Sequence, residues 1–282
     1  MSGKDSPTFS IEFFPPRTEA GRPKLDAVHR ELAALHPDFF SVTYGAGGST
    51  KEGTSELVLK YQAMGSSVAP HLSFGGTSEE EVRRLLAGYA EAGIQRIVAL
   101  RGDIPTESGK QQYRYASELV SFIRAESGDR FHIEVACYPE CHPQSPDFES
   151  DVHYFREKVN AGANSAITQY FFNADAYFRF VEYCQGKGID IPIVAGIMPI
   201  YNYANLTRFS EKCGAEIPRW LDKRLQDFQD DPEGLKSFGI DVVSSLCETL
   251  LDNGVPGLHF YSLNLSRAVI EIWNNLSLSD RR

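Results

Sequence analysis

The 282-residue chain lacks the features that mark several large protein classes. It has no apolar run near the ~20 residues that span a bilayer, and Met1–Ser10 has no apolar signal-peptide core. The net charge of −10 argues against a nucleic-acid or anionic-membrane partner. The five cysteines are odd in number and none forms CxxC, which is typical of a reducing compartment. We therefore expect a cytoplasmic protein with small-molecule partners.

Glycine-rich nucleotide-binding motifs are also absent. No GxGxxG follows a strand-like run, so a Rossmann-type dinucleotide site is not supported. Ser108-Gly109-Lys110 is not a P-loop, because Gln111 replaces serine or threonine and the preceding Gly102 is too distant. Neither of these phosphate-binding folds is therefore indicated.

Cysteine and histidine do not form a metal site by their spacing. Cys137 and Cys141 flank a strand end broken by proline, and no second ligand pair has metal spacing. We therefore expect no metal, and interpret His71 and His142 as hydrogen-bond donors at strand ends. The histidines without an assignable partner are expected to be solvated: His29, His36, His132 and His153.

What the sequence does have is a series of eight short apolar runs, each ending in a polar or Pro/Gly-rich tip. The first six start about 30 residues apart, the length of a strand plus a crossover helix. This layout predicts a single-domain (β/α)₈ barrel (TIM barrel) over residues 1–282, with its chemistry at the C-terminal ends of the strands. The runs are Phe9–Phe14, Phe39–Tyr44, Val68–Leu72, Ile94–Leu100, Ile133–Tyr138, Ser165–Tyr170, Ile191–Ile197 and Leu258–Leu263.

Helical spacing of apolar residues predicts a crossover helix in each interval. The first six lie at Glu19–Leu35, Thr50–Met64, after Ser78, and at Tyr115–Ala125, Asp151–Ala161 and Ala174–Gly186. The interval between Ile197 and Leu258 is much longer than the others. It is predicted to hold Tyr203–Lys212, a short helix from Pro218 and a long one over Pro232–Asn253. This elaborated crossover carries substrate contacts in one interpretation and only extra packing in the other.

The first run places a carboxylate among aromatic residues. It reads SIEFF from Ser10 on, and because side chains alternate along a strand, Glu12 shares a face with Ser10 and Phe14. Keeping a carboxylate ionised in such surroundings is costly, which favours the protonated form that a general acid needs near neutral pH. Glu12 is therefore a candidate acid. The alternative is a structural ion pair with Arg17 or Lys110.

The fourth run ends in a second candidate carboxylate. It reads LRGD from Leu100 to Asp103. Glycine lets the backbone pass close to a ligand, and Asp103 follows Gly102 directly at the expected barrel mouth. Asp103 is either a site residue or a capping aspartate beside a surface arginine.

Taken together, the motifs at the strand ends resemble those of the methylenetetrahydrofolate reductase family, in its short bacterial form. They follow one another in the family's order over all eight runs. The matching stretches are EFFPPR from Glu12, SVTYGAGGST from Ser41, APHL from Ala69, ALRGD from Ala99, YPE from Tyr138, AGAN from Ala161, ITQ from Ile167, GIMP from Gly196 and HFYSLN from His259.

This resemblance implies an FAD-dependent oxidoreductase of one-carbon and methionine metabolism. Such an enzyme reduces 5,10-methylenetetrahydrofolate to 5-methyltetrahydrofolate with electrons from NADH or NADPH. The flavin would be held non-covalently over the barrel top, and the two substrates would take turns on one flavin face, giving ping-pong kinetics. Members of the family are usually oligomeric, so a homo-oligomer is expected.

The resemblance also implies roles for individual residues. Glu12 is the expected acid that assists opening of the folate ring, Asp103 the carboxylate beside pterin and flavin, and Gln169 a contact of both substrates. The residues matched to substrate contacts are Thr43, Asp103, Gln169, Asn205, Phe209 and Tyr261. The residues matched to FAD contacts are Tyr44, Ala46, His71, Arg101, Gly102, Asp103, Ala116, Tyr138, His142, Asp151 and Lys158.

Three positions depart from the family's pattern. Leu265 stands where an arginine often contacts folate, with Arg267 close behind it. Asn205 stands where some members have glutamine, and Glu157 where some have an arginine near the cofactor phosphates. Two other interpretations stay open: a folate-binding barrel that transfers one-carbon groups without redox chemistry, and a non-enzymatic flavin- or folate-binding protein.

Overall fold

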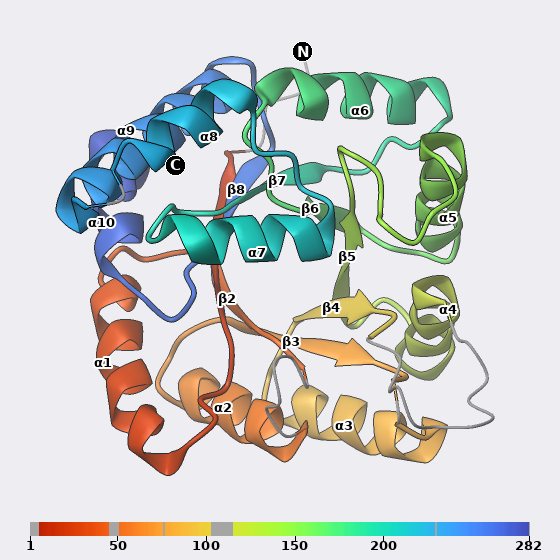
Figure 1. Cartoon of the computed structure of the whole chain (residues 1–282). Coiled ribbons are helices and arrows are strands. Elements are labelled where there is room, and N and C mark those ends of the chain that lie inside the picture. Colours follow the sequence, from red (N-terminus) through yellow and green to blue (C-terminus); the bar gives the residue numbers. More distant parts are fainter. Residues whose placement is uncertain (1–5, 45–50, 76, 103–114, 229, 282) are drawn as a thin grey trace.

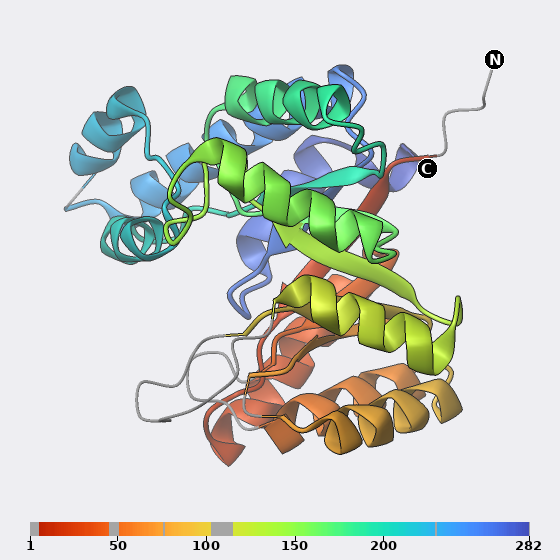
Figure 2. The same cartoon turned by 90° about the vertical axis from the view of Figure 1, so that its right-hand side faces the viewer.

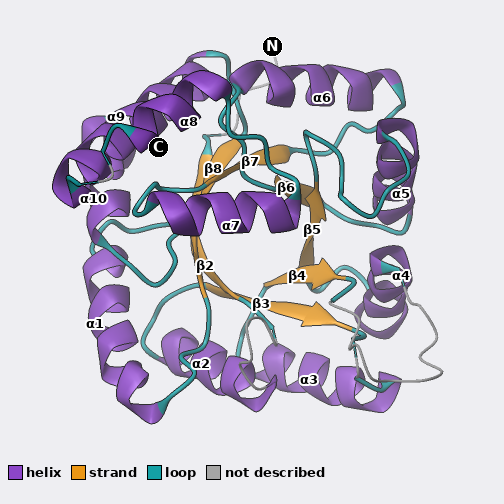
Figure 3. Cartoon of the chain, viewed as in Figure 1, coloured by secondary structure: helices purple, strands orange, loops and turns teal. Residues whose placement is uncertain are grey.

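Eight parallel strands close into a barrel in which each strand pairs with its neighbours in the sequence and β8 pairs with β1. The computed structural model describes residues 6–44, 51–75, 77–102, 115–228 and 230–281 (Figure 1). Helices enclose the ring of strands (Figure 3). The predicted (β/α)₈ fold is therefore confirmed. The strands are β1 Thr8–Phe13, β2 Phe39–Val42, β3 Val68–Ser73, β4 Arg96–Leu100, β5 His132–Cys137, β6 Ser165–Thr168, β7 Ile193–Ile197 and β8 Gly257–Tyr261.

The helices between the strands lie in the intervals where apolar spacing predicts them, and a further helix, not predicted from the sequence, follows the last strand. They are α1 Arg22–Ala33, α2 Lys51–Ala63, α3 Glu79–Glu91, α4 Ala116–Ser127, α5 Phe148–Asn160, α6 Ala174–Gly186, α7 Tyr203–Cys213, α8 Arg219–Gln226, α9 Pro232–Asp252 and α10 Arg267–Asn275. Helix α5 begins earlier than expected, because the Asp147 side chain accepts the Ser150 backbone N–H at 2.7 Å and caps the helix there.

Side chains alternate along each strand, so one set packs outward against the helices and the other packs inside the barrel. On β1, the outward side chains of Phe9 and Phe13 pack against helices, with Phe9 edge-on to Trp273 of α10 and Phe13 edge-on to Tyr61 of α2. The inward side chains form a small apolar layer made up of Phe39, Ala69, Val98, Ile167 and Val194. The strands also carry buried polar residues, among them Ser10, Ser41, His71 and His259, and the site described below is built from these.

The long interval between β7 and β8 holds α7, α8 and α9. Helix α7 crosses the C-terminal end of the barrel, in the centre of Figure 1. The turned view in Figure 2 places α7 at the end opposite to the start of β1. Asn202 caps its first turn by accepting the Asn205 backbone N–H at 2.9 Å, and Gly214, at φ +75°, ends it. A helix from the seventh crossover therefore faces the end where barrel enzymes carry their chemistry.

Two of the histidines expected to be solvated and without partners have partners in the fold. His29 is buried on α1, where its ring stacks on Tyr61 with centroids 3.8 Å apart and its Nε2 lies 2.9 Å from Ser66 Oγ. His132 lies at the start of β5, with Nε2 2.6 Å from Ser165 Oγ and 3.4 Å from the buried Glu134 carboxylate. The expectation was wrong because the partners come from other elements of the fold. His153 is exposed, as expected.

No described helix combines the length and the apolar composition needed to cross a bilayer. All five cysteines are free thiols, and Cys137, Cys184 and Cys247 are buried. Within the described ranges, no three His, Cys, Asp or Glu side chains are grouped as ligands for a metal ion.

Candidate active site

Glu12 projects into the barrel between two histidines. Its Oε2 lies 3.4 Å from His71 Nε2 on β3 and 3.7 Å from His259 Nε2 on β8. The Glu12 side chain keeps 18% of its surface exposed, whereas the side chain of His259 keeps 1%. Glu12 faces these histidines rather than Arg17, and Lys110, the other expected ion-pair partner, lies outside the described residues. The carboxylate therefore stands where the buried interior meets the barrel mouth.

The two histidines differ in their surroundings. His259 Nδ1 lies 2.7 Å from Ser10 Oγ, a buried contact that fixes the orientation of the ring. Burial lowers the pKa of His71 to about 4, so this imidazole is neutral at neutral pH. His259 was missed as a site residue from the sequence. The alternation of side chains along β8 could have identified His259, because it puts this residue on the same inward face as Tyr261.

Several buried polar atoms at this end of the barrel have no hydrogen-bond partner within the described ranges. They are Ser41 Oγ, Thr43 Oγ1 and His71 Nε2, whose 3.4 Å contact with Glu12 is not aligned as a hydrogen bond. Buried polar atoms are almost always paired in folded proteins, since leaving them unpaired costs free energy. Ser41 is opposite Glu12 in the β1–β2 register, Thr43 directly follows β2, and His71 on β3 lies 3.4 Å from the Glu12 carboxyl. Three such atoms indicate a place where a polar ligand completes the pairing.

Tyr261 lies beside Glu12, its partner in the β1–β8 register, and its side chain reaches toward the end of β6. Its hydroxyl donates to the Thr168 carbonyl oxygen at 2.7 Å. Its ring lies against Gly196, where an added Cβ would stand 2.8 Å from Tyr261 Cε2 and 2.1 Å from the Thr168 oxygen. Gln169 follows β6, and its Oε1 accepts the Tyr170 backbone N–H at 3.0 Å. The Tyr261 hydroxyl is thus already donated to the backbone, so only the ring and the oxygen lone pairs can serve a ligand.

The two predicted substrate residues Asn205 and Phe209 come from helix α7 and not from the strand ends. Asn205 is exposed and accepts a hydrogen bond from Arg208 Nη2 at 3.2 Å. Phe209 is half-buried, with the Arg208 guanidinium 5.2 Å from its ring centre. Because α7 crosses the barrel end, both residues are carried by the element that covers Glu12's end of the barrel (Figure 1).

A cavity of about 590 Å³ lies beside the strand ends, between β4, β5, α4 and α5. Most of the residues matched to FAD contacts line it, namely Arg101, Gly102, Ala116, Tyr138, His142, Asp151 and Lys158. His71 lies inside the barrel instead, and the Tyr44 hydroxyl lies 3.1 Å from Thr77 Oγ1. Ala46 and Asp103 are outside the described residues. Residues spread over the middle third of the sequence thus meet around one cavity.

The cationic side of this cavity suits an anionic ligand. Lys158 Nζ donates to the Ala136 carbonyl oxygen at 2.6 Å and, among the described residues, takes part in no ion pair. Burial lowers the pKa of Lys158, which is the cost of holding an ammonium group there. A lysine has three N–H donors, so two remain for a ligand. Arg101 adds a guanidinium, which donates to Gln144 Oε1.

The remaining walls of the cavity bring backbone and aromatic groups close to a ligand. Gly102 has φ +81°, and a Cβ there would lie 2.6 Å from Ser73 Oγ, so only glycine fits. The rings of Tyr138 and His142 pack edge to face at 4.5 Å. Asp151 fixes this wall by accepting the His142 backbone N–H at 2.9 Å. Two cations, a close backbone and an aromatic wall are a donor set that fits a flavin dinucleotide.

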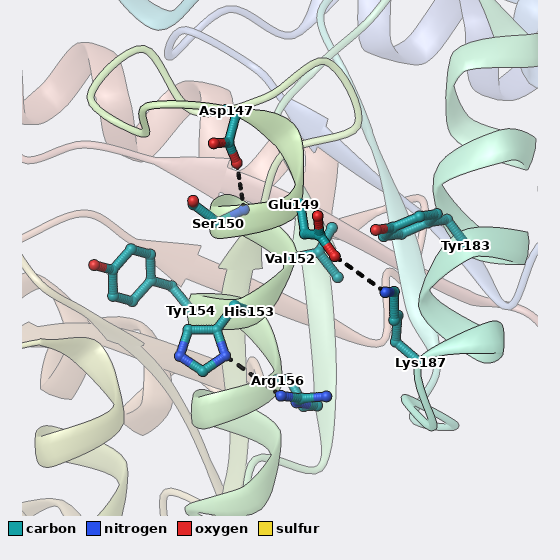
Figure 4. A pocket seen from close by; sticks show the side chains of 9 residues that line it. All are labelled: Asp147, Glu149, Ser150, Val152, His153, Tyr154, Arg156, Tyr183 and Lys187. Carbon is teal, nitrogen blue, oxygen red and sulfur yellow. Dashed lines mark hydrogen bonds and ion pairs between the residues drawn. The ribbon is translucent and has the colours of Figure 1, made fainter.

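A second cavity, of about 470 Å³, lies outside the barrel along α5 and α6. Its charged side chains are turned toward one another: Lys187 Nζ lies 3.3 Å from Glu149 Oε1, and Arg156 contacts His153 (Figure 4). None of the predicted site residues lines this cavity. One of its two cations, Lys187, is already paired with Glu149, so this cavity offers less to an anion than the cavity around Lys158.

The departures from the family's pattern have clear places in the fold. Leu265 is 45% exposed after β8. Arg267 begins α10 and pairs with Glu233 at 3.0 Å and Glu271 at 2.8 Å, so its guanidinium is held on the outer helices. Glu157 is exposed on α5, next to Lys158.

Comparisons with known proteins agree over nearly the whole chain. A protein-family model described as methylenetetrahydrofolate reductase matches residues 1–277. The 5,10-methylenetetrahydrofolate reductase of Pectobacterium carotovorum is 38% identical over 270 residues, which cover 95% of this chain and 90% of the relative. The enzyme of the same name from Escherichia coli is 37% identical with the same coverage. Methylenetetrahydrofolate reductase (NADH) 1 of Arabidopsis thaliana is 37% identical, over 96% of this chain but 48% of that longer protein.

Among solved structures, an uncharacterised protein from Clostridium thermocellum matches with a TM-score of 0.67 at 18% identity. The match covers 98% of this chain and 94% of that one, which is described as binding two copies of 5-methyl-5,6,7,8-tetrahydrofolic acid. At this level of identity the likeness concerns the barrel fold alone.

Proposed function

Since the chain belongs to the methylenetetrahydrofolate reductase family, we propose that it passes electrons from NADH or NADPH through bound FAD to 5,10-methylenetetrahydrofolate, forming 5-methyltetrahydrofolate. The protein is an oxidoreductase that reduces methylenetetrahydrofolate. The observation that carries the proposal furthest is the joint placement of Glu12 and the cavity around Lys158 at the C-terminal end of one barrel.

FAD, when bound, accepts electrons from the nicotinamide and gives them to the folate. Lys158 and Arg101 would hold its phosphates through charge-assisted hydrogen bonds. Gly102 would let the backbone approach the flavin, and the rings of Tyr138 and His142 would form one side of its binding site. Asp103 and Ala46 belong to the same proposed set by their motifs.

Glu12 would act as the acid of the folate half-reaction. The protonated carboxyl would give its proton to the departing nitrogen of the imidazolidine ring, and the ring opens as that nitrogen leaves its carbon. Burial lowers the pKa of His71, so Glu12 meets an uncharged imidazole at 3.4 Å. His259, fixed by Ser10, would hold Glu12 from the other side.

The two substrates would use one pocket in turn. Thr43 follows β2 and Gln169 follows β6, so the two residues face each other across the barrel mouth, and Thr43 Oγ1 is a buried atom without a partner in the described part of the chain. Phe209, Asn205 and Tyr261 would complete the folate side. We also propose that the chain is a single catalytic domain that works as a cytoplasmic homo-oligomer, which light scattering of the purified protein tests.

One experiment tests the function as a whole. The purified protein should be yellow, and NADH or NADPH should bleach it in the absence of oxygen. Methylenetetrahydrofolate should then restore the colour. A colourless protein that binds folate would favour one-carbon transfer without redox chemistry. A yellow protein that neither nucleotide bleaches would favour a binding protein.

A further inference from the structure

The loop between β5 and α5, residues 138–147, faces two ways. Tyr138 and His142 line the cavity around Lys158. Cys141, between them, has φ +74°, in the left-handed region that reverses the chain. Glu140 is turned toward the end of α7, where its Oε2 accepts the backbone N–H of Glu216 at 2.8 Å. One short loop therefore contacts both the proposed flavin cavity and the chain that follows α7.

Burying part of the Glu140 carboxyl group costs free energy. Its Oε1 is buried and has no hydrogen-bond partner within the described ranges. Burial raises the pKa of Glu140, and the nearby Glu216 carboxylate adds to the shift. The Glu216 N–H lies beyond Cys213, the last residue of α7, so it is not one of the groups that a helix C-terminus leaves unpaired. Its partner comes from a different segment of the chain, 76 residues earlier in the sequence, and the contact therefore ties the two loops together.

Packing strengthens the same junction. Gly214 ends α7 at φ +75°, and a Cβ there would lie 2.8 Å from Pro143 Cγ in the loop. Tyr170, which follows Gln169 directly, places its hydroxyl 3.0 Å from Ser210 Oγ on α7. Three elements meet here: the loop that lines the cavity, the end of β6, and the C-terminal turn of α7.

We infer that Glu140 is a positioning residue that sets where α7 lies over the barrel mouth and thereby sets the affinity for the folate. This inference rests on the proposed function. Phe209 lies about 8 Å and Asn205 about 14 Å along the helix axis from Gly214, given a rise of 1.5 Å per residue. A helix released at that end tilts, and both side chains then move relative to the strand ends. Glu140 itself touches no substrate; it acts through the Glu216 backbone.

The test compares Glu140→Ala with Glu140→Gln, which keeps an acceptor oxygen for the Glu216 N–H. Glu216→Ala is the matched control, because it removes a side chain and keeps the same backbone donor. Glu140→Ala should raise KM for methylenetetrahydrofolate about tenfold, the upper range for the loss of one uncharged hydrogen bond. The value of kcat, FAD content and bleaching by NADH should stay within about twofold, and Glu140→Gln and Glu216→Ala should resemble the wild type.

A second measurement needs no turnover. Backbone amides of residues 203–214 should exchange hydrogen for deuterium several-fold faster in flavin-free Glu140→Ala than in flavin-free wild type, while those of α6 stay unchanged. Unchanged exchange, or an unchanged KM, would overturn the inference. Equal damage from Glu140→Gln and Glu140→Ala would also overturn it, because charge rather than the hydrogen bond would then matter. A wild type without reductase activity would defeat the proposed function, whereas the exchange experiment would still decide whether Glu140 holds α7.

Discussion

His71 Nε2 lies 3.4 Å from Glu12 Oε2, yet burial lowers the pKa of that imidazole to about 4. The pair is therefore a neutral histidine beside a carboxyl group at neutral pH, rather than an ion pair. His71 therefore places an uncharged ring beside Glu12 at the barrel mouth.

Removing the acidity of Glu12 should separate the two half-reactions. Glu12→Gln keeps the shape of the side chain but cannot donate a carboxylic proton. Oxidation of the reduced flavin by methylenetetrahydrofolate should slow by ~10²–10⁴-fold, the usual contribution of general acid catalysis. Reduction by NADH should stay within about tenfold, or ~1.4 kcal/mol in barrier height. Stopped-flow absorbance gives both rates, and equal losses in both would show that Glu12 shapes the flavin site instead.

Replacing Lys158 should weaken flavin binding. Lys158→Ala removes the ammonium group whose free donors face the cavity, and the FAD dissociation constant should rise by about tenfold or more, given ~1.5–3 kcal/mol for a hydrogen bond to a charged group. Lys187→Ala is the control, because Lys187 pairs with Glu149 outside this cavity. Fluorescence titration of flavin-free protein with FAD measures both. The assignment fails if both variants bind FAD like the wild type.

Steady-state kinetics should show that nicotinamide and folate take turns. Gln169 is matched to a residue that contacts both substrates, so occupancy by one should exclude the other. Double-reciprocal plots at several fixed folate concentrations should give parallel lines. Intersecting lines would show that both substrates bind together.

Stability should fall between pH 6.5 and pH 4 because of buried histidines. Burial lowers the pKa of both His29 and His71 to about 4. In this window the unfolded chain binds protons that the folded state excludes, so the free energy of unfolding is fully retained above about pH 6.5 and declines below it. Each group contributes up to about 3 kcal/mol of this decline.

The variant His29→Phe isolates one of these terms, since a phenyl ring can keep the stack on Tyr61. Urea unfolding at pH 7 and at pH 4.5 should show a smaller difference in the variant than in the wild type. The same pH dependence in both proteins would contradict the role of His29.

Gly196 should tolerate no side chain. A Cβ at this position would lie 2.1 Å from the Thr168 carbonyl oxygen and 2.8 Å from Tyr261 Cε2. Gly196→Ala should therefore cost about 2 kcal/mol or more of the free energy of unfolding, as overpacked interiors do. Gly88→Ala on α3 is the control, because nothing lies within 4 Å of its added Cβ. That variant should be neutral or more stable by up to ~1 kcal/mol in the same urea experiment.

The sequence predicts the barrel because its cues are local. Each apolar run is followed by helical spacing, and the order of such units determines a parallel barrel. The same alternation places Glu12 on an inward face. What the spacing cannot give is the identity of its neighbours: His259 is on the last strand, and it meets Glu12 only because β8 pairs with β1.

The errors have the same origin. His29 and His132 were expected in solvent because no partner is near them in sequence, whereas Ser66 and Ser165 reach them from other elements. The tether between Glu140 and Glu216 likewise joins two loops that are distant in sequence. Contacts made by chain closure, rather than by local pattern, decide these positions.

The pairing of β1 with β8 also affects when the site can form during synthesis of the chain. A ribosome makes Glu12 early and Ser10 beside it, but His259, which both of them contact, emerges only when almost the whole chain has been synthesised. A nascent chain can form the first βα units and still lack the contacts of His259 with Glu12 and Ser10. Under the proposed mechanism, the surroundings of the acid are complete only when β8 has closed the ring.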